Sequence, residues 1–171
     1  MNAQRRTPAT PDGLVVERAR EAQWRAVRDV RLAALAESPS AFGSTLEREQ
    51  TYDAARWRQW TRAAVFLASV GGTPVGIAAG VPGDTEASRQ LVAVWVSPDV
   101  RGRGVSSQLL ERVEEWAVSD GARCLHLWLA RGNVPARRLY ERRGYVDTGR
   151  VQPLPSNPAV LEDQMVLTLH R

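Results

Sequence analysis

A glycine-rich turn between an apolar segment and an amphipathic helix is the part of the chain best suited to bind a ligand. Leu91–Val96 is apolar, Arg101–Gly104 alternates arginine with glycine, and apolar residues then recur at helical spacing over Val105–Val118. The free N–H groups at the start of a helix attract anions, and the helix dipole reinforces this attraction. Glycine lets the backbone approach a phosphate closely, and the arginines add positive charge. The spacing therefore indicates a pyrophosphate cradle, and the alternative is a plain strand-to-helix turn with solvated arginines.

Two other phosphate-binding motifs do not fit this turn. The dinucleotide fingerprint G-x-G-x-x-G requires a third glycine at position 107, where the chain has Ser107. It also requires an acidic residue at the end of the next strand, whereas Cys124–Ala130 leads into Arg131. The chain contains no lysine, which excludes a P-loop and every Schiff-base mechanism. We therefore expect neither a nicotinamide site nor a P-loop nucleotide site.

A second segment supplies polar and aromatic side chains on a short predicted helix. Asn133 stands at its start, where it can act as the N-cap, and Tyr140 follows two turns later. Together the two segments resemble the motifs of the GNAT superfamily of N-acetyltransferases. Val94–Ser106 is similar to motif A, with Arg101–Ser106 matching its [RQ]-x-x-G-x-[GA] loop except for serine in the last place. Asn133–Tyr145 is similar to motif B, N-x-x-A-x-x-x-Y-x-x-x-G-[FY].

The resemblance extends over residues 64–169 and implies that acetyl-CoA lies between two splayed parallel strands, here Leu91–Val96 and Cys124–Ala130. The residues that it assigns to the cofactor are Val94, Trp95, Val96, Arg101, Gly102, Arg103, Gly104, Val105, Ser106, Asn133, Ala136 and Tyr140. The implied reaction is direct attack of a primary amine on the thioester in a ternary complex. A backbone N–H near Val96 would polarise the thioester carbonyl, and Tyr140 would be the general acid that protonates the CoA thiolate.

The general base is less clearly marked. Some family members use a glutamate five residues before the motif B asparagine, a position that Trp128 occupies here. His126 lies on the same strand face by alternation and titrates near neutral pH, so we predict it as the second catalytic residue. Glu47 and Glu49 are alternatives, as is deprotonation through water. The competing interpretation of each of these side chains is a purely structural or solvated role.

The elements that position these residues follow from the apolar pattern. Continuous or alternating apolar runs predict strands, and apolar residues three and four apart predict helices. The predicted strands are 13–18, 64–70, 75–81, 91–96, 124–130, 145–151 and 163–169, and the predicted helices are 21–36, 44–63, 105–118 and 133–143. The order β-α-α-β-β-β-α-β-α-β-β indicates an α/β fold. The resemblance implies a mixed, mostly antiparallel sheet whose central parallel pair is splayed around the cofactor.

The domain organisation is simple. Residues 1–12 are predicted to form a flexible N-terminal lead-in, and residues 13–171 a single N-acetyltransferase domain. A loop rich in proline, serine and asparagine over 152–158 is predicted to join the last two strands.

The composition limits what else the chain can do. Of the 171 residues 25% are charged, and 23 arginines against 19 acidic residues give a net charge of +4. The single cysteine, Cys124, and two histidines do not indicate a metal site. The apolar runs are too short to span a bilayer, and the N-terminus lacks a signal-like apolar stretch, so we expect a cytoplasmic protein without a membrane partner.

Three functions compete at this level. The leading one is an N-acetyltransferase that uses acetyl-CoA as cosubstrate and a small-molecule or peptide amine as acceptor, with a homodimer compatible with the family. A non-catalytic acyl-CoA-binding regulator of the same fold is an alternative. An arginine-rich nucleic-acid-binding domain is the third, but the chain has no basic run longer than two residues and no interleaved basic and aromatic strand. We therefore expect no nucleic-acid partner.

Overall fold

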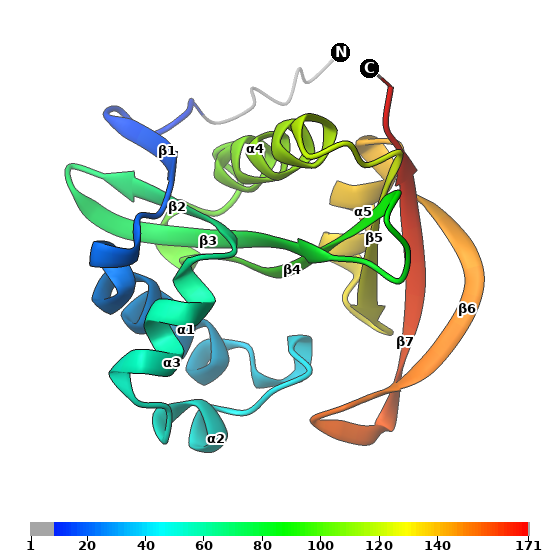
Figure 1. The fold of residues 1–171 in the computed structure, drawn as a ribbon, viewed down its shortest axis with the longest axis horizontal. Helices are drawn as coiled ribbons and strands as arrows, with labels where there is room; N and C mark the ends of the chain where they lie inside the picture. Colours follow the sequence, from blue (N-terminus) through cyan, green and yellow to red (C-terminus); the bar gives the residue numbers. More distant parts are fainter. Residues whose placement is uncertain (1–8, 171) are drawn as a thin grey trace, which may run out of the picture.

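Seven strands form one mixed sheet that helices cover on both faces (Figure 1). The computed structural model describes residues 9–170. The strands lie in the order β1-β2-β3-β4-β5-β7-β6, and all neighbours are antiparallel except β4 and β5, which are parallel. This arrangement confirms the predicted α/β fold with a mostly antiparallel sheet and one central parallel pair.

The observed bounds follow the predicted order of elements. The strands are β1 (Leu14–Arg18), β2 (Ala64–Val70), β3 (Thr73–Pro82), β4 (Ser88–Val96), β5 (Cys124–Ala130), β6 (Val146–Leu154) and β7 (Asn157–Thr168). The α-helices are α1 (Trp24–Glu37), α2 (Leu46–Gln50), α3 (Ala54–Thr61), α4 (Val105–Ser119) and α5 (Val134–Arg142), and a short 3-10 helix, η2, spans Pro39–Ala41.

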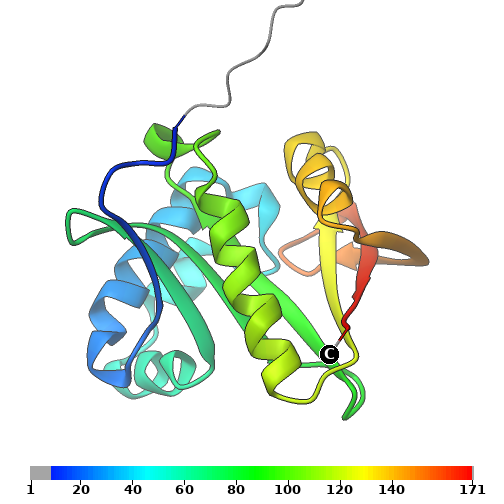
Figure 2. The ribbon, with the colours of Figure 1, turned by 90° about the horizontal axis from the view of Figure 1, so that it is seen from above.

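The parallel pair is joined over a short stretch only. Ser88, Arg89 and Gln90 of β4 pair with residues 124–126 of β5, and beyond Gln90 the two strands diverge, as Figure 2 shows. A bulge in β4 accompanies the divergence, because Val92 pairs with Ala79 of β3 while Trp95 pairs with Ile77. Between them Ala93 has a φ of 58°, a left-handed conformation that is rare outside glycine. The far halves of β4 and β5 are thereby held apart.

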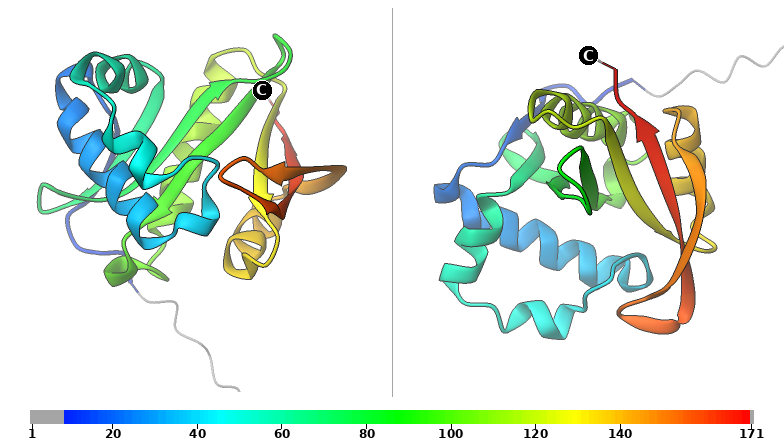
Figure 3. Two further views of the ribbon diagram at one scale, coloured as in Figure 1. Left: turned by 90° about the horizontal axis from the view of Figure 1, so that it is seen from below. Right: turned by 45° about the vertical axis from the view of Figure 1, so that its right-hand side comes forward.

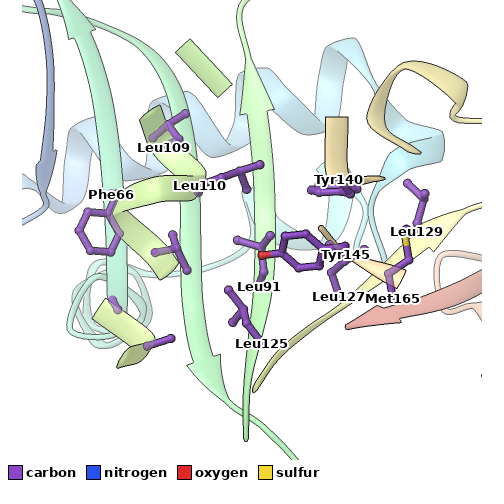
Figure 4. Close-up of a cluster of buried hydrophobic side chains, with 14 of the residues drawn as sticks. Phe66, Leu91, Leu109, Leu110, Leu125, Leu127, Leu129, Tyr140, Tyr145 and Met165 are labelled. Atoms are coloured by element: carbon purple, nitrogen blue, oxygen red, sulfur yellow. The ribbon is translucent and has the colours of Figure 1, made fainter. Parts of the chain in front are cut away.

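The two faces of the sheet carry different helices. α4 and α5 lie on one face, and α1, α2 and α3 lie on the other (Figures 1 and 3). Under α4 and α5 the apolar residues of the helices pack with the odd-numbered residues of β5 in one buried cluster, part of which Figure 4 shows. Its members include Phe66, Leu91, Leu109, Leu110, Leu125, Leu127, Leu129, Tyr140 and Met165. This packing fixes which side of β5 and β7 faces α1.

Two sequence predictions were wrong in detail. The helix expected over 44–63 is broken into α2 and α3, because Asp53 accepts a hydrogen bond from the N–H of Arg56 (2.8 Å) and starts a new helix. The loop expected over 152–158 is a turn of two residues, since β6 continues to Leu154 and β7 begins at Asn157. Pro153 is accommodated because β6 is the edge strand of the sheet.

The ends and surfaces of the molecule add three observations. Residues 1–8 of the predicted lead-in lie outside the described residues, and β1 begins two residues after Asp12. Within residues 9–170, none of the helices combines the length and apolar character needed to cross a membrane. The edge strand β6 leaves Val146 and Val151 exposed, and a homodimer stays a prediction.

Candidate functional site

A cavity of about 710 Å³ occupies the space between the diverging ends of β4 and β5. Its walls come from both faces of the sheet and from the turn before α4. The lining residues include Leu91–Val96 of β4, Leu127–Ala130 of β5, Val100–Gly102 and Gly104–Ser107 of the turn and α4, Asn133, Ala136 and Tyr140 at α5, and Ser38, Ala41 and Phe42 beyond α1. The structure thus brings the two predicted motifs together around a single cavity.

The turn before α4 presents a helix N-terminus to this cavity. Gly102 (φ 74°) and Gly104 (φ 82°) both adopt left-handed conformations, which glycine allows at low cost. Gly104 is the N-cap of α4, and glycine has no side chain with which to bond the first N–H groups of the helix. Val105, Ser106 and Ser107 of the first turn line the cavity. The predicted anion cradle therefore has the geometry of a helix N-terminus directed at a ligand.

The two arginines of the turn have partners within the protein. The Nε of Arg101 donates to the carbonyl of Val96 (2.9 Å), and its guanidinium donates to the carboxylate of Glu37 (2.6 and 3.2 Å). The Nε of Arg103 donates to the carbonyl of Ala9 (3.1 Å), and Arg103 is not among the described lining residues. Both side chains position the turn, so an anion here would be bound chiefly by backbone N–H groups.

Glu37 is a residue that sequence reasoning missed. It ends α1, and its carboxylate accepts hydrogen bonds from Arg101, from the indole N–H of Trp95 (3.0 Å) and from Ser38. Arg101, followed by Ser38 and Trp95, lowers the pKa of Glu37 to about 2 through these hydrogen bonds. One carboxylate therefore ties α1 to β4 and to the glycine turn. Arg101 is 64 positions away in the chain, which is why no local sequence signal indicates the contact.

Tyr140 and Asn133 lie where the motif predicts them. Tyr140 is buried (6% exposed), lines the cavity and packs its ring against Tyr145, with centroids 5.6 Å apart, and Figure 4 shows both rings beside Leu127. Burial raises the pKa of the Tyr140 phenol well above its usual value, so the group keeps its proton and can act only as a donor near neutral pH. The side chain of Asn133 caps α5 by accepting from the N–H of Ala136 (3.3 Å).

The predicted bases lie away from this cavity. His126 is not among its described lining residues; its Nε2 is 3.3 Å from Cys124 Sγ, and burial lowers its pKa. Glu49 is buried in a two-bond ion pair with Arg31 (3.0 and 2.8 Å), which occupies its carboxylate, and Glu47 is exposed. The position of Trp128 is different, because this residue does line the cavity.

Known proteins share both the sequence pattern and the fold. Residues 29–145 match the acetyltransferase (GNAT) family. An uncharacterized N-acetyltransferase from Methanocaldococcus jannaschii is 29% identical over 107 residues, which is 55% of this chain and 47% of that protein. A mycothiol acetyltransferase from Brachybacterium faecium is 35% identical over 69 residues, 40% of this chain and 21% of that protein. The chain thus spans less than half the length of these curated relatives.

Solved structures are similar over nearly the whole chain. A putative acetyltransferase from Salmonella typhimurium, solved with its cofactor acetyl-CoA, has a TM-score of 0.75 at 18% identity and covers 92% of this chain and 95% of its own. A ribosomal-protein-alanine N-acetyltransferase from Brucella melitensis has a TM-score of 0.74 at 22% identity and covers 91% of this chain and 99% of its own. At these identities the likeness concerns the fold. With the family match over residues 29–145, it shows that the chain belongs to the GNAT acetyltransferase family.

Proposed function

We propose that this protein is an N-acetyltransferase that moves the acetyl group of acetyl-CoA to a primary amine by direct attack in a ternary complex. The observation that carries the proposal is the cavity between β4 and β5, which runs from the N-terminus of α4 to Tyr140. Backbone groups of a strand that leaves its neighbour need other partners, and an extended pantetheine arm offers them along Val94–Val96. The phosphates of the cosubstrate then bind the N–H groups of α4.

The chemistry requires two proton transfers and one stabilised charge. The amine nitrogen attacks the thioester carbonyl carbon, and the negative charge that forms on the carbonyl oxygen is stabilised by a backbone N–H of β4 near Val96. The C–S bond breaks as the sulfur takes the proton of the Tyr140 hydroxyl. The proton of the amine leaves through water or to His126, the base that we predict from sequence.

The charges of the molecule support this function over nucleic-acid binding. Four of the arginines near the turn and α5 are held by acidic side chains, so their charge is locally balanced. These ion pairs are Arg101–Glu37, Arg131–Asp163, Arg137–Asp147 and Arg143–Glu114. The non-catalytic regulator remains the alternative of the same fold, and turnover decides between the two. Release of free thiol from acetyl-CoA in the presence of a panel of amines measures that turnover.

The glycine turn gives the first test. Gly104→Val places a branched side chain at the mouth of the α4 N-terminus, so we expect the Kd for acetyl-CoA to rise at least ~10-fold, the loss of about 1.4 kcal/mol. Gly121→Val is the matched control, because Gly121 also has a left-handed φ (81°) and lies beyond the opposite end of α4. Acetyl-CoA-induced shifts in Tm measure the affinity. Equal acetyl-CoA affinity in the two variants would contradict the cradle.

Tyr140 gives the second test. Tyr140→Phe removes only the hydroxyl, so kcat should fall by about 10²-fold or more, the usual contribution of a general acid, while acetyl-CoA affinity changes little. Tyr145→Phe is the control, because Tyr145 packs on Tyr140 but its hydroxyl donates to Glu114 (3.4 Å). Steady-state kinetics measure both variants. Unchanged kcat in Tyr140→Phe would remove the phenol from the mechanism.

Glu37 gives a pH-dependent test. Its pKa is lowered from 4.5 to about 2 in the folded protein, so the ion pair with Arg101 stabilises the fold fully above pH 4.5 and ceases to do so as the pH falls to about 2. The pair is partly exposed, so we expect Glu37→Gln to lower the free energy of unfolding by about 1 kcal/mol or less at pH 7. Denaturation of both proteins from pH 7 to pH 2 measures the difference. A difference that stays constant over that range would refute the assignment.

A further inference from the structure

The cavity has a second side, opposite the glycine turn. The turn, α4 and α5 bound it on one face of the sheet, and Ser38, Ala41 and Phe42 bound it on the face that α1 covers. A cosubstrate whose phosphates lie at the N-terminus of α4 fills the first side. The amine acceptor must then approach the thioester from the side of Ser38, Ala41 and Phe42.

Strand alternation identifies which residues of β5 and β7 face this second side. Leu127 and Leu129 of β5 and Met165 of β7 belong to the core under α4, so the residues between them face the opposite way. These are Trp128 and Ala130 of β5, which line the cavity, and Gln164 and Glu162 of β7. Cross-strand pairing sets Gln164 directly opposite Trp128 and Glu162 directly opposite Ala130.

Glu162 is unusual among the charged residues of the protein. It is 6% exposed, and the hydrogen bond recorded for its carboxylate comes from the amide of Gln152 (2.9 Å). Within residues 9–170, Glu49 is also a buried carboxylate, but Arg31 neutralises it, whereas no basic side chain lies within 4 Å of Glu162. Burial raises the pKa of Glu162 because the carboxylate loses water without gaining a cation. A buried carboxylate without a counter-charge destabilises a fold.

The other charges on this face are already matched. Arg150 of β6 lies over the ring of Trp128 (5.8 Å to the centroid) and pairs with Asp84 (3.3 Å). His126 lies further toward the paired end of β5, beside Cys124. Among these groups Glu162 is the one left with an unbalanced negative charge, and it is one strand away from Ala130 of the cavity wall.

We propose that Glu162 determines the specificity for the acceptor by binding a second cationic group of the amine, so that the preferred acceptors are diamines. This inference rests on the proposed acetyltransferase function. Glu162 stands behind the cavity wall, not among its described lining residues, so the reacting nitrogen at the thioester is not the group that it binds. A second ammonium group, several carbon atoms away on the same molecule, would reach past Ala130 and form a charge-assisted hydrogen bond with the carboxylate.

The test compares two amines of equal length, 1,4-diaminobutane and n-butylamine. We expect the wild-type protein to acetylate the diamine with a kcat/KM at least ~10-fold higher, as a hydrogen bond between charged groups warrants. Glu162→Gln keeps the shape and still accepts from Gln152, and it should remove this preference, mainly through KM, while n-butylamine is affected less than about 2-fold. Glu162→Asp, which retains the charge, should restore part of the preference. Glu115→Gln, on the exposed face of α4, is the control.

Each result decides the matter. Equal kcat/KM of the wild-type protein for the two amines, absence of diamine turnover, or an equal loss for both amines in Glu162→Gln would overturn the role of Glu162. Tm shifts with acetyl-CoA, measured on the same samples, separate this failure from that of the proposed function. A missing shift would overturn both, whereas a normal shift together with n-butylamine turnover would leave the acetyltransferase function standing.

Discussion

The unpaired backbone between β4 and β5 is the constraint on which the site depends. Two parallel strands that separate after three paired residues leave N–H and C=O groups in the middle of a sheet without strand partners, and such groups must be satisfied by something else. The bulge at Ala93 keeps them apart, although a left-handed alanine costs roughly 1–2 kcal/mol. Pairing of β4 with β3 on both sides of the bulge supplies the support for that strain. A ligand with an extended polar arm restores the missing hydrogen bonds.

The contacts around this gap explain how distant parts of the chain maintain one geometry. Glu37 at the end of α1 holds both the indole of Trp95 and the guanidinium of Arg101, so the acceptor side and the phosphate side of the cavity share one ion pair. The arginines that the sequence presents as potential phosphate ligands are therefore mostly structural. The anion site relies on the backbone at Gly104, where positive charge comes from the helix dipole.

Local pattern predicts the elements well where apolar periodicity is strong. The bounds of β2 and β5 agree with the predicted strands, and α4 is one residue longer than predicted. The helix expected over 44–63 failed because Asp53, a polar residue compatible with a helix, acts as an N-cap and starts a new one. The short expected strand at 163–169 failed because prolines near its start are tolerated beside an edge strand.

The site was predictable in part for a similar reason. Gly102, Gly104, Asn133 and Tyr140 belong to contiguous motifs, and the structure brings them to one cavity. Glu37 and Glu162 depend on contacts between residues far apart in the sequence or on the facing of a strand whose start was misplaced. Neither has a local signature, because a solvated acid and a buried one have the same letter. Three-dimensional burial and pairing separate them.

Amide hydrogen exchange with and without acetyl-CoA tests the central claim most directly, since it reports the backbone groups themselves. The account predicts that acetyl-CoA slows exchange at the amides of β4 that face β5, within Val94–Val96, and at Val105–Ser107 of α4. Amides at the paired end of the two strands, near Gln90, should be unaffected. Slowed exchange elsewhere, with none at these two segments, would contradict the account.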